Sequence, residues 1–456
     1  MSLNVINPFD GSLVCSLDYD SDSDVQSKVD AAHQAQISWR QIPIDQRISI
    51  VEEGLSQFRS LARETISEVS LQMGKPISEA RNELETVFDR ANYMISIARE
   101  SLAAEILPDK EGFHRRIEHE PLGVVLNLAA WNYPLIIPVN VVVPALIAGN
   151  TVLLKHSART PLSGVAYQQA FGKLQVPDLV TNLVLGHEQT ARLISDNRIA
   201  HVAFTGSVAG GAAVHREVSK RFIDCGLELG GNDPAYIAED ADLSTTSANV
   251  VEGACYNAGQ SCCAVERAYV HSSQLDEFVT GALEAMSSLQ MGNPLDESTT
   301  LGPLVGSEVL DQLEEQVEDA VERGASLLCG GKRVPNEKGN FFPPTLLVGA
   351  TNDSLVMQEE SFGPILPILS VEDDDEALQQ MNDNRFGLTA SVWTRDRERA
   401  EHFAKNLNTG TVFQNRCDYL DPALPWTGVG DSGKGSTLSK HGFFHLTRRK
   451  AIHFRL

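Results

Sequence analysis

Residues 121–154 read PLGVVLNLAAWNYPLIIPVNVVVPALIAGNTVLL and form the most apolar stretch of the chain. The residues at 124–126 predict a short strand, 134–146 predict a buried helix, and 151–154 predict a second strand after the helix-ending pair Gly149-Asn150. Asparagines and prolines interrupt the stretch, whereas a helix that crosses a bilayer needs about 20 apolar residues without such interruptions. The stretch therefore indicates a buried strand–helix–strand unit and not a membrane span.

The alternation of strands and helices continues along the chain. Residues 24–103 carry apolar side chains at three- and four-residue spacing, which predicts helices. Further on, helices are predicted at about 161–171 and 189–195, and strands at 183–185 and 202–204. Strands that alternate with helices pair in parallel through right-handed crossovers. We therefore predict an α/β fold that begins with a Rossmann-like, doubly wound sheet of the dinucleotide-binding kind.

A second alternation follows after about residue 230. Its predicted elements are helices near 241–256 and 275–289 and strands at 268–271, 364–369 and 389–393. These elements predict a second α/β domain. The tail 443–456 carries spaced apolar residues among many basic ones, which predicts a strand paired outside its own domain. The edge of such a strand would be covered by a partner subunit or left open to unwanted pairing.

Composition narrows the class of protein. A chain of 456 residues is long enough for two or three domains, and its net charge of −24 argues against nucleic acid or an anionic membrane as a partner. The N-terminus lacks the basic-then-apolar order of a signal peptide. Seven scattered cysteines do not suggest a disulfide framework, so we expect a cytoplasmic protein. The 12 histidines show no paired spacing of metal ligands, and we expect no metal.

Two segments combine glycine with reactive or phosphate-binding groups. In Thr205-Gly-Ser-Val-Ala-Gly-Gly211, which follows a predicted strand, glycines let the backbone approach a ligand and the next helix offers N–H groups to a phosphate. A plain strand-to-helix turn is the alternative. In Asn257-Ala-Gly-Gln-Ser-Cys-Cys263 an accessible thiol would act as a nucleophile. The alternative is a pair of small buried hydrophobic residues.

Three further segments place a polar side chain beside a turn. Glu228, in Leu-Glu-Leu-Gly-Gly, lies at an apolar strand end, where either a cation neutralises it or burial raises its pKa for use as a general base. Asn132, in Trp-Asn-Tyr-Pro, would cap the following helix or polarise a developing oxyanion. Glu360, in Glu-Glu-Ser-Phe-Gly-Pro, resembles an ordinary solvated loop residue when taken alone.

Together, in this order and spacing, the five segments closely resemble the aldehyde dehydrogenase superfamily, and the resemblance covers essentially the whole chain. It implies that Cys262, rather than Cys263, attacks an aldehyde carbonyl. The Asn132 side chain and the Cys262 backbone N–H would hold the oxyanion, and Glu228 would activate the water that releases the acid. Since the branch that passes its acyl group to coenzyme A generally lacks this glutamate, the resemblance favours the hydrolytic, non-CoA-acylating branch.

The resemblance also implies an NAD(P) site. Lys155 matches the lysine at the adenosine ribose, Ser207 the serine at the pyrophosphate and Glu360 the glutamate at the nicotinamide ribose. The other implied cofactor-binding positions are Trp131, Gly206, Gly211, Gly230 and Phe362. Ala158 stands where NAD-preferring members often carry a glutamate, and Lys155, His156 and Arg159 surround it with basic or nearly basic side chains. We therefore expect NADP to be accepted, alone or alongside NAD.

The aldehyde itself is less clearly indicated. Tyr133, Ile136 and Tyr256 are the candidate lining residues, and Arg416 would hold a substrate carboxylate with two parallel hydrogen bonds. Such a role indicates a semialdehyde acid, for example succinic semialdehyde. The alternative for Arg416 is an ion pair with Asp418 or Asp421.

The resemblance divides the chain into three parts. Residues 1–102 and 122–229 would bind the cofactor, 230–433 would form the catalytic domain, and 103–121 with 434–456 would form a small β extension for a homodimer or homotetramer. Two other functions remain open. One is an acyl-transferring or reductive relative, and the other is a non-catalytic, redox-responsive protein in which Cys262 and Cys263 form a vicinal disulfide.

Overall fold

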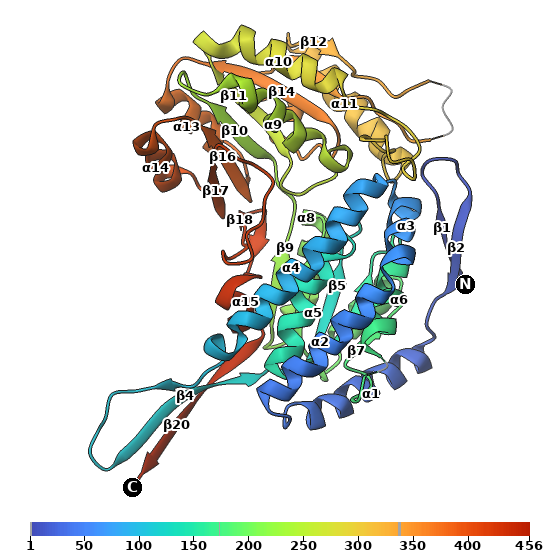
Figure 1. Ribbon diagram of the computed structural model, residues 1–456, viewed down its shortest axis with the longest axis vertical. Helices are drawn as coiled ribbons and strands as arrows, with labels where there is room; N and C mark the ends of the chain where they lie inside the picture. The colour runs from blue at the N-terminus through green and yellow to red at the C-terminus, as the bar shows by residue number, and fades with distance from the viewer. Residues whose placement is uncertain (1, 173, 336–338) are drawn as a thin grey trace.

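Two mainly parallel sheets form the two halves of the molecule in the computed structural model, which describes residues 2–172, 174–335 and 339–456 (Figure 1). The first sheet has the strand order β19-β9-β8-β5-β6-β7, with β19 antiparallel to β9 and the other pairs parallel. Its strands are β5 (Val124–Ala129), β6 (Thr151–His156), β7 (Val180–Asn182), β8 (Ile199–Thr205), β9 (Asp224–Glu228) and β19 (Gly433–Lys434).

Helices cover both faces of this first sheet. They are α1 (Asp22–Trp39), α2 (Ile44–Ser60), α3 (Ala62–Met73), α4 (Ile77–Ser101), α5 (Ile136–Ala148), α6 (Pro161–Phe171), α7 (His187–Ile194) and α8 (Val208–Val218). Val125, Val152 and Leu154 of the sheet pack with α2 to α6, whereas Leu126 and Leu153 pack with α1, α7 and α8. Burial on both faces explains why these strands read as continuous apolar runs.

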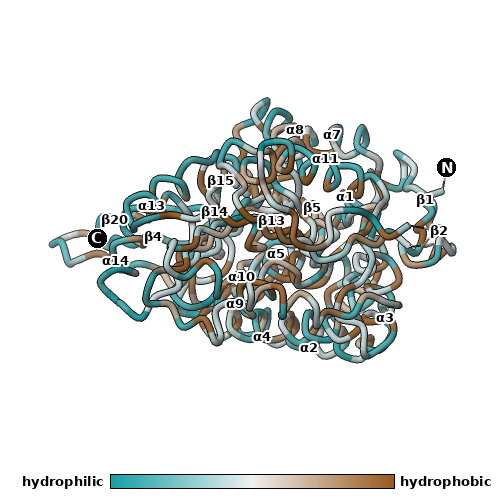
Figure 2. The backbone as a smooth tube through the Cα atoms, turned by 90° about the horizontal axis from the view of Figure 1, so that it is seen from above, coloured by the Kyte–Doolittle hydropathy of each residue, from teal (hydrophilic) through white to brown (hydrophobic). Residues whose placement is uncertain are grey.

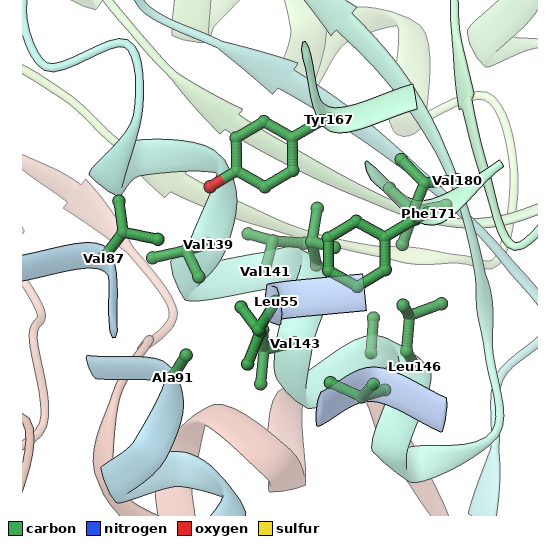
Figure 3. Packing of buried hydrophobic residues seen from close by; sticks show 14 of the residues in the cluster. Leu55, Val87, Ala91, Val139, Val141, Val143, Leu146, Tyr167, Phe171 and Val180 are labelled. Carbon is green, nitrogen blue, oxygen red and sulfur yellow. The ribbon is translucent and has the colours of Figure 1, made fainter. Parts of the chain in front are cut away.

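Helix α5 explains why residues 121–154 are the most apolar stretch of the chain. It lies between the sheet and the helices α2 and α4, and Figure 3 shows Val139, Val141, Val143 and Leu146 among side chains from α2, α4 and α6. A helix that is apolar on all sides is expected in the core of a large protein. The predicted doubly wound sheet is therefore present, and this buried helix packs against its strands β5 and β6.

The second sheet has the order β12-β13-β14-β11-β10-β16-β17, in which β12 is antiparallel to β13 and the other pairs are parallel. Its strands are β10 (Asp233–Ile237), β11 (Val265–His271), β12 (Ser326–Cys329), β13 (Thr345–Val348), β14 (Ile365–Val371), β16 (Thr389–Trp393) and β17 (Thr411–Gln414). Its helices are α9 (Leu243–Cys255), α10 (Leu275–Ser287), α11 (Ser307–Glu322), α12 (Leu355–Gln358), α13 (Asp374–Asn382) and α14 (Arg397–Asn406).

A narrow arm leaves the first half of the molecule (Figure 1). It consists of β3 (Glu105–Ile106), β4 (Phe113–Pro121) and β20 (Thr447–Arg455), in the order β20-β4-β3. The predicted strand in the tail is confirmed: it runs antiparallel to β4, with Thr447 opposite Pro121 and Arg455 opposite Phe113. Just before it, α15 (Ser439–His445) packs against α4 and α5, so that part of the tail lies with the first sheet.

Smaller elements complete the chain. They are the hairpin of β1 (Ser2–Ile6) and β2 (Leu13–Asp18), the pair β15 (Phe386–Gly387) and β18 (Val429–Gly430), and the 3₁₀ turns η1 (Tyr256–Gly259) and η2 (Ser272–Gln274). Seen from above, hydrophobic stretches gather in the interior around β5 and β13, and hydrophilic ones lie on the outer loops (Figure 2). Within the described ranges, no helix is long and apolar enough to span a membrane.

One predicted strand is wrong in its position. The strand expected at 183–185 is β7, at Val180–Asn182. The strand ends before Val184 because the backbone of Val184 bonds to Asp20 instead of to β6. The Asp20 carboxylate accepts the Val184 N–H at 3.0 Å, and the Val184 carbonyl accepts the Asp20 N–H at 3.0 Å. Leu183 and Leu185 remain buried, and this burial gave them the appearance of a strand.

Candidate active site

A cavity of about 570 Å³ lies between the two halves and contains Cys262 and Glu228 in its wall. Helix α4 contributes Glu83, Thr86 and Arg90, and α5 contributes Ile136 and Asn140. The loop after β17 supplies residues 415–420 on the other side. A pocket of this size and mixed polarity suits a small ligand.

The loop that carries Cys262 has an unusual backbone. Asn257 and Ala258 adopt left-handed φ angles of 53° and 55°, and Gly259 follows at 72°. Non-glycine residues in this region carry about 1–3 kcal/mol of strain each and persist where the surroundings hold them. The Gln260 side chain makes two hydrogen bonds that hold this loop in place. It donates to the Asn257 carbonyl at 3.1 Å and accepts the Val305 N–H at 2.9 Å.

The two adjacent cysteines have different surroundings. Both border the cavity, and both are free thiols. Cys263 is 4% exposed, packs against Leu388 and Trp426, and donates its S–H to Asp418 Oδ1 at 2.8 Å. Cys262 is partly exposed. The sulfur that a molecule in the cavity can reach is therefore that of Cys262, the cysteine that the resemblance selects.

Asn132 does not cap the helix that follows it. Helix α5 begins at Ile136 with Leu135 at the N-cap position and no side-chain cap, so the capping alternative is wrong. The buried Asn132 amide instead donates to the Gln260 carbonyl at 3.2 Å, and the Asn257 amide donates to the Asn132 carbonyl at 3.1 Å. Asn132 is thereby held beside the loop of Cys262, and its amide keeps a second N–H.

Glu228 ends β9 and faces the same cavity. Thr205 Oγ1 donates to its Oε2 at 3.2 Å, and Thr437 Oγ1 donates to its Oε1. Among the described residues no cation forms an ion pair with it. Burial raises the pKa of Glu228 above its ordinary value, while the two hydroxyl groups act in the opposite direction. Glu228 is partly exposed toward the cavity. Of the two states that the sequence leaves open, a carboxylate neutralised by a cation and one with a raised pKa, the second is the one present, and it suits a general base.

Helix α4 carries two acidic groups that sequence reasoning missed. Glu83 accepts the N–H of Leu135 at 2.7 Å and forms a buried ion pair with Lys75. Glu79, one turn earlier, accepts the Asn257 N–H at 2.9 Å. Two glutamates four residues apart on a helix face that is otherwise apolar are the signal that would have found them, because buried carboxylates need partners.

A second hollow, of about 410 Å³, lies between the start of α8 in the first half and α11 in the second half, and is bordered by Ser207 and Glu360. Ser207 is the N-cap of α8, and its Oγ accepts the Gly210 N–H at 3.2 Å. The first turn of α8 therefore presents backbone N–H groups, the usual setting for a phosphate. Gly211 packs so closely that a Cβ atom would lie 2.5 Å from Leu229, and one at Gly206 would lie 2.7 Å from the Phe204 ring.

Glu360 is not the solvated residue that its segment alone suggests. Its Oε1 accepts the Gly231 N–H at 3.0 Å, and a Cβ atom at Gly230 would lie 2.5 Å from the same carboxylate. Burial and the nearby charge of Glu266 raise the pKa of Glu360. Glu266 also accepts the Phe362 N–H at 2.9 Å, which holds this residue at a φ of 54°.

Trp131 and Phe362 form an edge-to-face pair with ring centroids 5.5 Å apart. The Arg159 guanidinium lies 5.6 Å from the Trp131 ring and forms an ion pair with Glu308. Lys155 is in β6 near its carboxyl end, and burial lowers its pKa.

Three positions around the end of β6 bear on cofactor choice. Ala158 is exposed, and its methyl side chain carries no charge. His156 is buried, its Nε2 lies 3.0 Å from the Pro134 carbonyl oxygen, and burial lowers its pKa to about 4. It is therefore neutral near pH 7, and the expectation that it adds basic character is wrong. The other basic residues close to Ala158 in the sequence are Lys155 and Arg159, of which Arg159 is paired with Glu308.

The candidate substrate residues divide into two groups. Tyr133, Ile136 and Tyr256 all line the cavity. Arg416 borders it but is exposed, with its guanidinium 3.4 Å from the centre of the Tyr419 ring. In the described part of the chain it forms no ion pair with Asp418 or Asp421, so that alternative is wrong. The same part of the chain contains no cluster of three His, Cys, Asp or Glu side chains arranged to hold a metal ion.

Comparison with known proteins agrees with this geometry. Residues 1–452 match the model of the aldehyde dehydrogenase family, and the chain therefore belongs to that family. The predicted fold class and the prediction of an aldehyde-oxidising enzyme are both confirmed. The crystal structure of lactaldehyde dehydrogenase from Escherichia coli superimposes with a TM-score of 0.95 at 30% identity, covering 100% of this chain and 96% of that one.

Two curated relatives illustrate the range of substrates. A succinate-semialdehyde dehydrogenase [NADP(+)] of Deinococcus radiodurans is 35% identical over 448 residues, which cover 98% of this chain and 94% of that protein. The lactaldehyde dehydrogenase of Escherichia coli is 31% identical over 456 residues, which cover 99% of this chain and 95% of that protein.

Proposed function

We propose that the protein oxidises a small aldehyde to the carboxylic acid with NAD(P), through a covalent intermediate on Cys262. One observation carries the proposal: the accessible sulfur of Cys262 and the carboxylate of Glu228 border the same cavity. The Asn132 amide bonds to the carbonyl of Gln260, two residues before that sulfur. A nucleophile and a base therefore border one ligand-sized space, and a hydrogen-bond donor is bonded to the loop that carries the nucleophile.

In the first step the Cys262 thiolate attacks the aldehyde carbon and the carbonyl oxygen becomes an oxyanion. The second N–H of the Asn132 amide and the Cys262 backbone N–H are the donors for this oxygen. Donors fixed where charge develops stabilise the transition state because they need no reorganisation. The bonds of Asn132 and Asn257 across the two loops supply this fixation.

The second hollow fits a dinucleotide. Gly230 leaves the Glu360 carboxylate open where a Cβ atom would collide with it, and Ser207 begins a helix whose N–H groups suit a pyrophosphate. Lys155, Ser207 and Glu360 would hold the two riboses and the phosphates, while Trp131 and Phe362 would border the cleft. NAD(P) bound there supplies the nicotinamide ring that accepts the hydride.

Loss of the hydride leaves a thioester on Cys262, and Glu228 completes the reaction. Its carboxylate takes a proton from a water molecule, whose oxygen attacks the thioester and releases the acid and the thiolate. The presence of this base in the cavity supports hydrolysis rather than transfer to coenzyme A.

We further propose that NADP is accepted. Ala158 presents no carboxylate that would repel a 2′-phosphate, and Lys155 and Arg159 lie close by in the sequence. The names of relatives that use NADP(+), among them the protein of Deinococcus radiodurans, support this proposal. They also support a semialdehyde as the substrate.

An oligomer is proposed from the arm. Strand β20 has β4 on one side and is the outer strand of its sheet, and Phe454 and Leu456 are exposed near its end. An unpaired edge with apolar side chains is normally covered. A second copy of the chain is the occupant that we propose.

Glu228→Gln tests the central proposal. Wild-type protein should oxidise aldehydes continuously, whereas the variant should release one equivalent of reduced cofactor per site and then stall, with an acyl group of the expected mass on Cys262. Continuous turnover by the variant would overturn the role of Glu228. Transfer of the acyl group to added coenzyme A at the wild-type rate would instead favour the acyl-transferring alternative.

A further inference from the structure

One buried charge in the cavity has almost no partners. Arg90, on α4, is 5% exposed and borders the cavity that contains Cys262 and Glu228. Its Nη1 donates to Asn140 Oδ1 at 3.2 Å, and Nε is buried without an acceptor. Among the described residues no carboxylate lies within ion-pair distance of the guanidinium. Since a guanidinium carries five N–H donors, most of them lack a protein acceptor.

A second buried arginine shows what a structural role looks like in this molecule. Arg267 is 1% exposed, and all three of its nitrogens donate to protein oxygens, those of Asn232, Tyr269 and Met381 among them, at 2.8–3.2 Å. Buried polar groups are normally satisfied in this way because an unpaired one is costly. Arg90 departs from this pattern, and the cavity is the place from which its missing partner can come.

We infer that Arg90 is the residue that binds a carboxylate at the far end of the aldehyde substrate. This inference rests on the proposed function and names its substrate class, short-chain semialdehydes with a terminal carboxylate. A planar guanidinium matches a carboxylate with two parallel, charge-assisted hydrogen bonds. Arg416, the sequence-based candidate for this task, is exposed and stacked on Tyr419 at the rim, where water screens its charge.

The acidic residues of the cavity limit the choice of anion. Glu228, Glu252 and Asp418 border the same space, and burial raises the pKa of Asp418 to about 7. A phosphate would add up to two negative charges beside them, whereas a carboxylate adds one. Burial lowers the pKa of Arg90, and the charge of Glu228 across the cavity opposes this only in part, so a single anion that pairs directly with the guanidinium would complete the compensation. The same acidic residues, Glu228, Glu252 and Asp418, would attract a cation. An aldehyde with a terminal amine is therefore the alternative to a substrate with a terminal carboxylate.

Substrate selectivity tests the inference. The ratio of kcat/KM for 4-oxobutanoate to that for butanal should exceed one in the wild type and fall by about 30-fold or more in Arg90→Gln, the effect of losing a charge-assisted pair. Arg90→Lys should restore part of the ratio. Arg81→Gln on the exposed side of the same helix, where Arg81 pairs with Glu297, is the matched control and should leave the ratio unchanged.

The outcomes separate the inference from the proposed function. Equal selectivity in the wild type and in Arg90→Gln, or a wild-type preference for 4-aminobutanal over 4-oxobutanoate, overturns the role of Arg90 while aldehyde oxidation stands. Absence of oxidation of every aldehyde overturns the proposed function. Binding of succinate by calorimetry needs no turnover: it should be weakened about 30-fold in Arg90→Gln, and undiminished binding by a variant with wild-type melting behaviour overturns the inference.

Discussion

The carboxylate of Glu79 accepts the backbone N–H of Asn257 at 2.9 Å, although 178 residues separate the two. Through this bond α4, which packs against the first sheet, holds the loop that carries Cys262. One turn along α4, Glu83 holds Leu135 in the loop that carries Asn132. The distance between nucleophile and oxyanion donor is therefore set by two carboxylates on one rigid helix.

Replacing Glu79 should separate a positioning role from a general loss of structure. In Glu79→Ala the strained Asn257 loses its anchor, and we expect kcat to fall about 10- to 100-fold, since about 1–3 kcal/mol is lost when a buried donor loses its acceptor. KM for the cofactor should change little, because Glu79 does not border the hollow proposed for the cofactor. Glu79→Gln keeps an oxygen that can accept the same N–H and should recover most of the rate. Equal rates in the Ala and Gln variants would contradict the role.

Glu79 also predicts how stability depends on pH. Burial raises its pKa from the ordinary 4.5 to about 8, so the folded protein holds the proton over a range in which the unfolded chain has released it. This contribution to stability is complete below about pH 4.5 and is lost as the pH rises toward 8. The melting temperature should therefore fall less between pH 6 and pH 9 in Glu79→Gln than in the wild type, as measured by calorimetry.

The two cysteines should respond differently to the same change. Cys262→Ser should abolish aldehyde oxidation, because a serine hydroxyl is hardly ionised near neutral pH. Cys263→Ser should remain active within about threefold, since its hydroxyl can donate to Asp418 as the thiol does. Alkylation by iodoacetamide, read by mass spectrometry, should label Cys262 before Cys263. Loss of activity in both variants would instead favour a function that requires Cys262 and Cys263 together.

Much of this site follows from the sequence because it lies where local patterns end. Asn132, Lys155, Ser207 and Glu228 come at or just after the carboxyl ends of β5, β6, β8 and β9, and parallel strands bring such ends to one edge. Apolar runs and glycine turns suffice to place these residues. The motif around Cys262 adds the chemistry.

What the sequence leaves out depends on contacts between distant segments. The partner of Glu79 lies in another half of the molecule, and the neutral state of His156 results from burial that no local pattern reports. Asn132 has the local signature of a helix cap, yet its amide bonds to the carbonyl of Gln260, 128 residues further along the chain. Arg90 lies on an ordinary amphipathic helix, and only its lack of partners distinguishes it.

The hydroxyl of Thr437 should tune the base. It donates to Glu228 and lowers the pKa that burial raises. In Thr437→Val this donor is lost, the pKa of Glu228 rises further, and the acidic limb of the kcat–pH profile should move to higher pH by up to about one unit. Thr437→Ser keeps the donor and should keep the profile. A limb that does not move in the valine variant would show that another group controls it.

Cofactor choice should depend on the side chain at Ala158. Glu at this exposed position would place a carboxylate near the site proposed for the 2′-phosphate and repel it. In NAD the 2′-hydroxyl of the ribose could instead donate a hydrogen bond to this carboxylate. We therefore expect Ala158→Glu to lower kcat/KM for NADP by about 10-fold or more, the factor that corresponds to about 1.4 kcal/mol, and to lower it much less for NAD. Ala158→Gln has nearly the same size without the charge, so a loss of the same extent in that variant would attribute the effect to bulk.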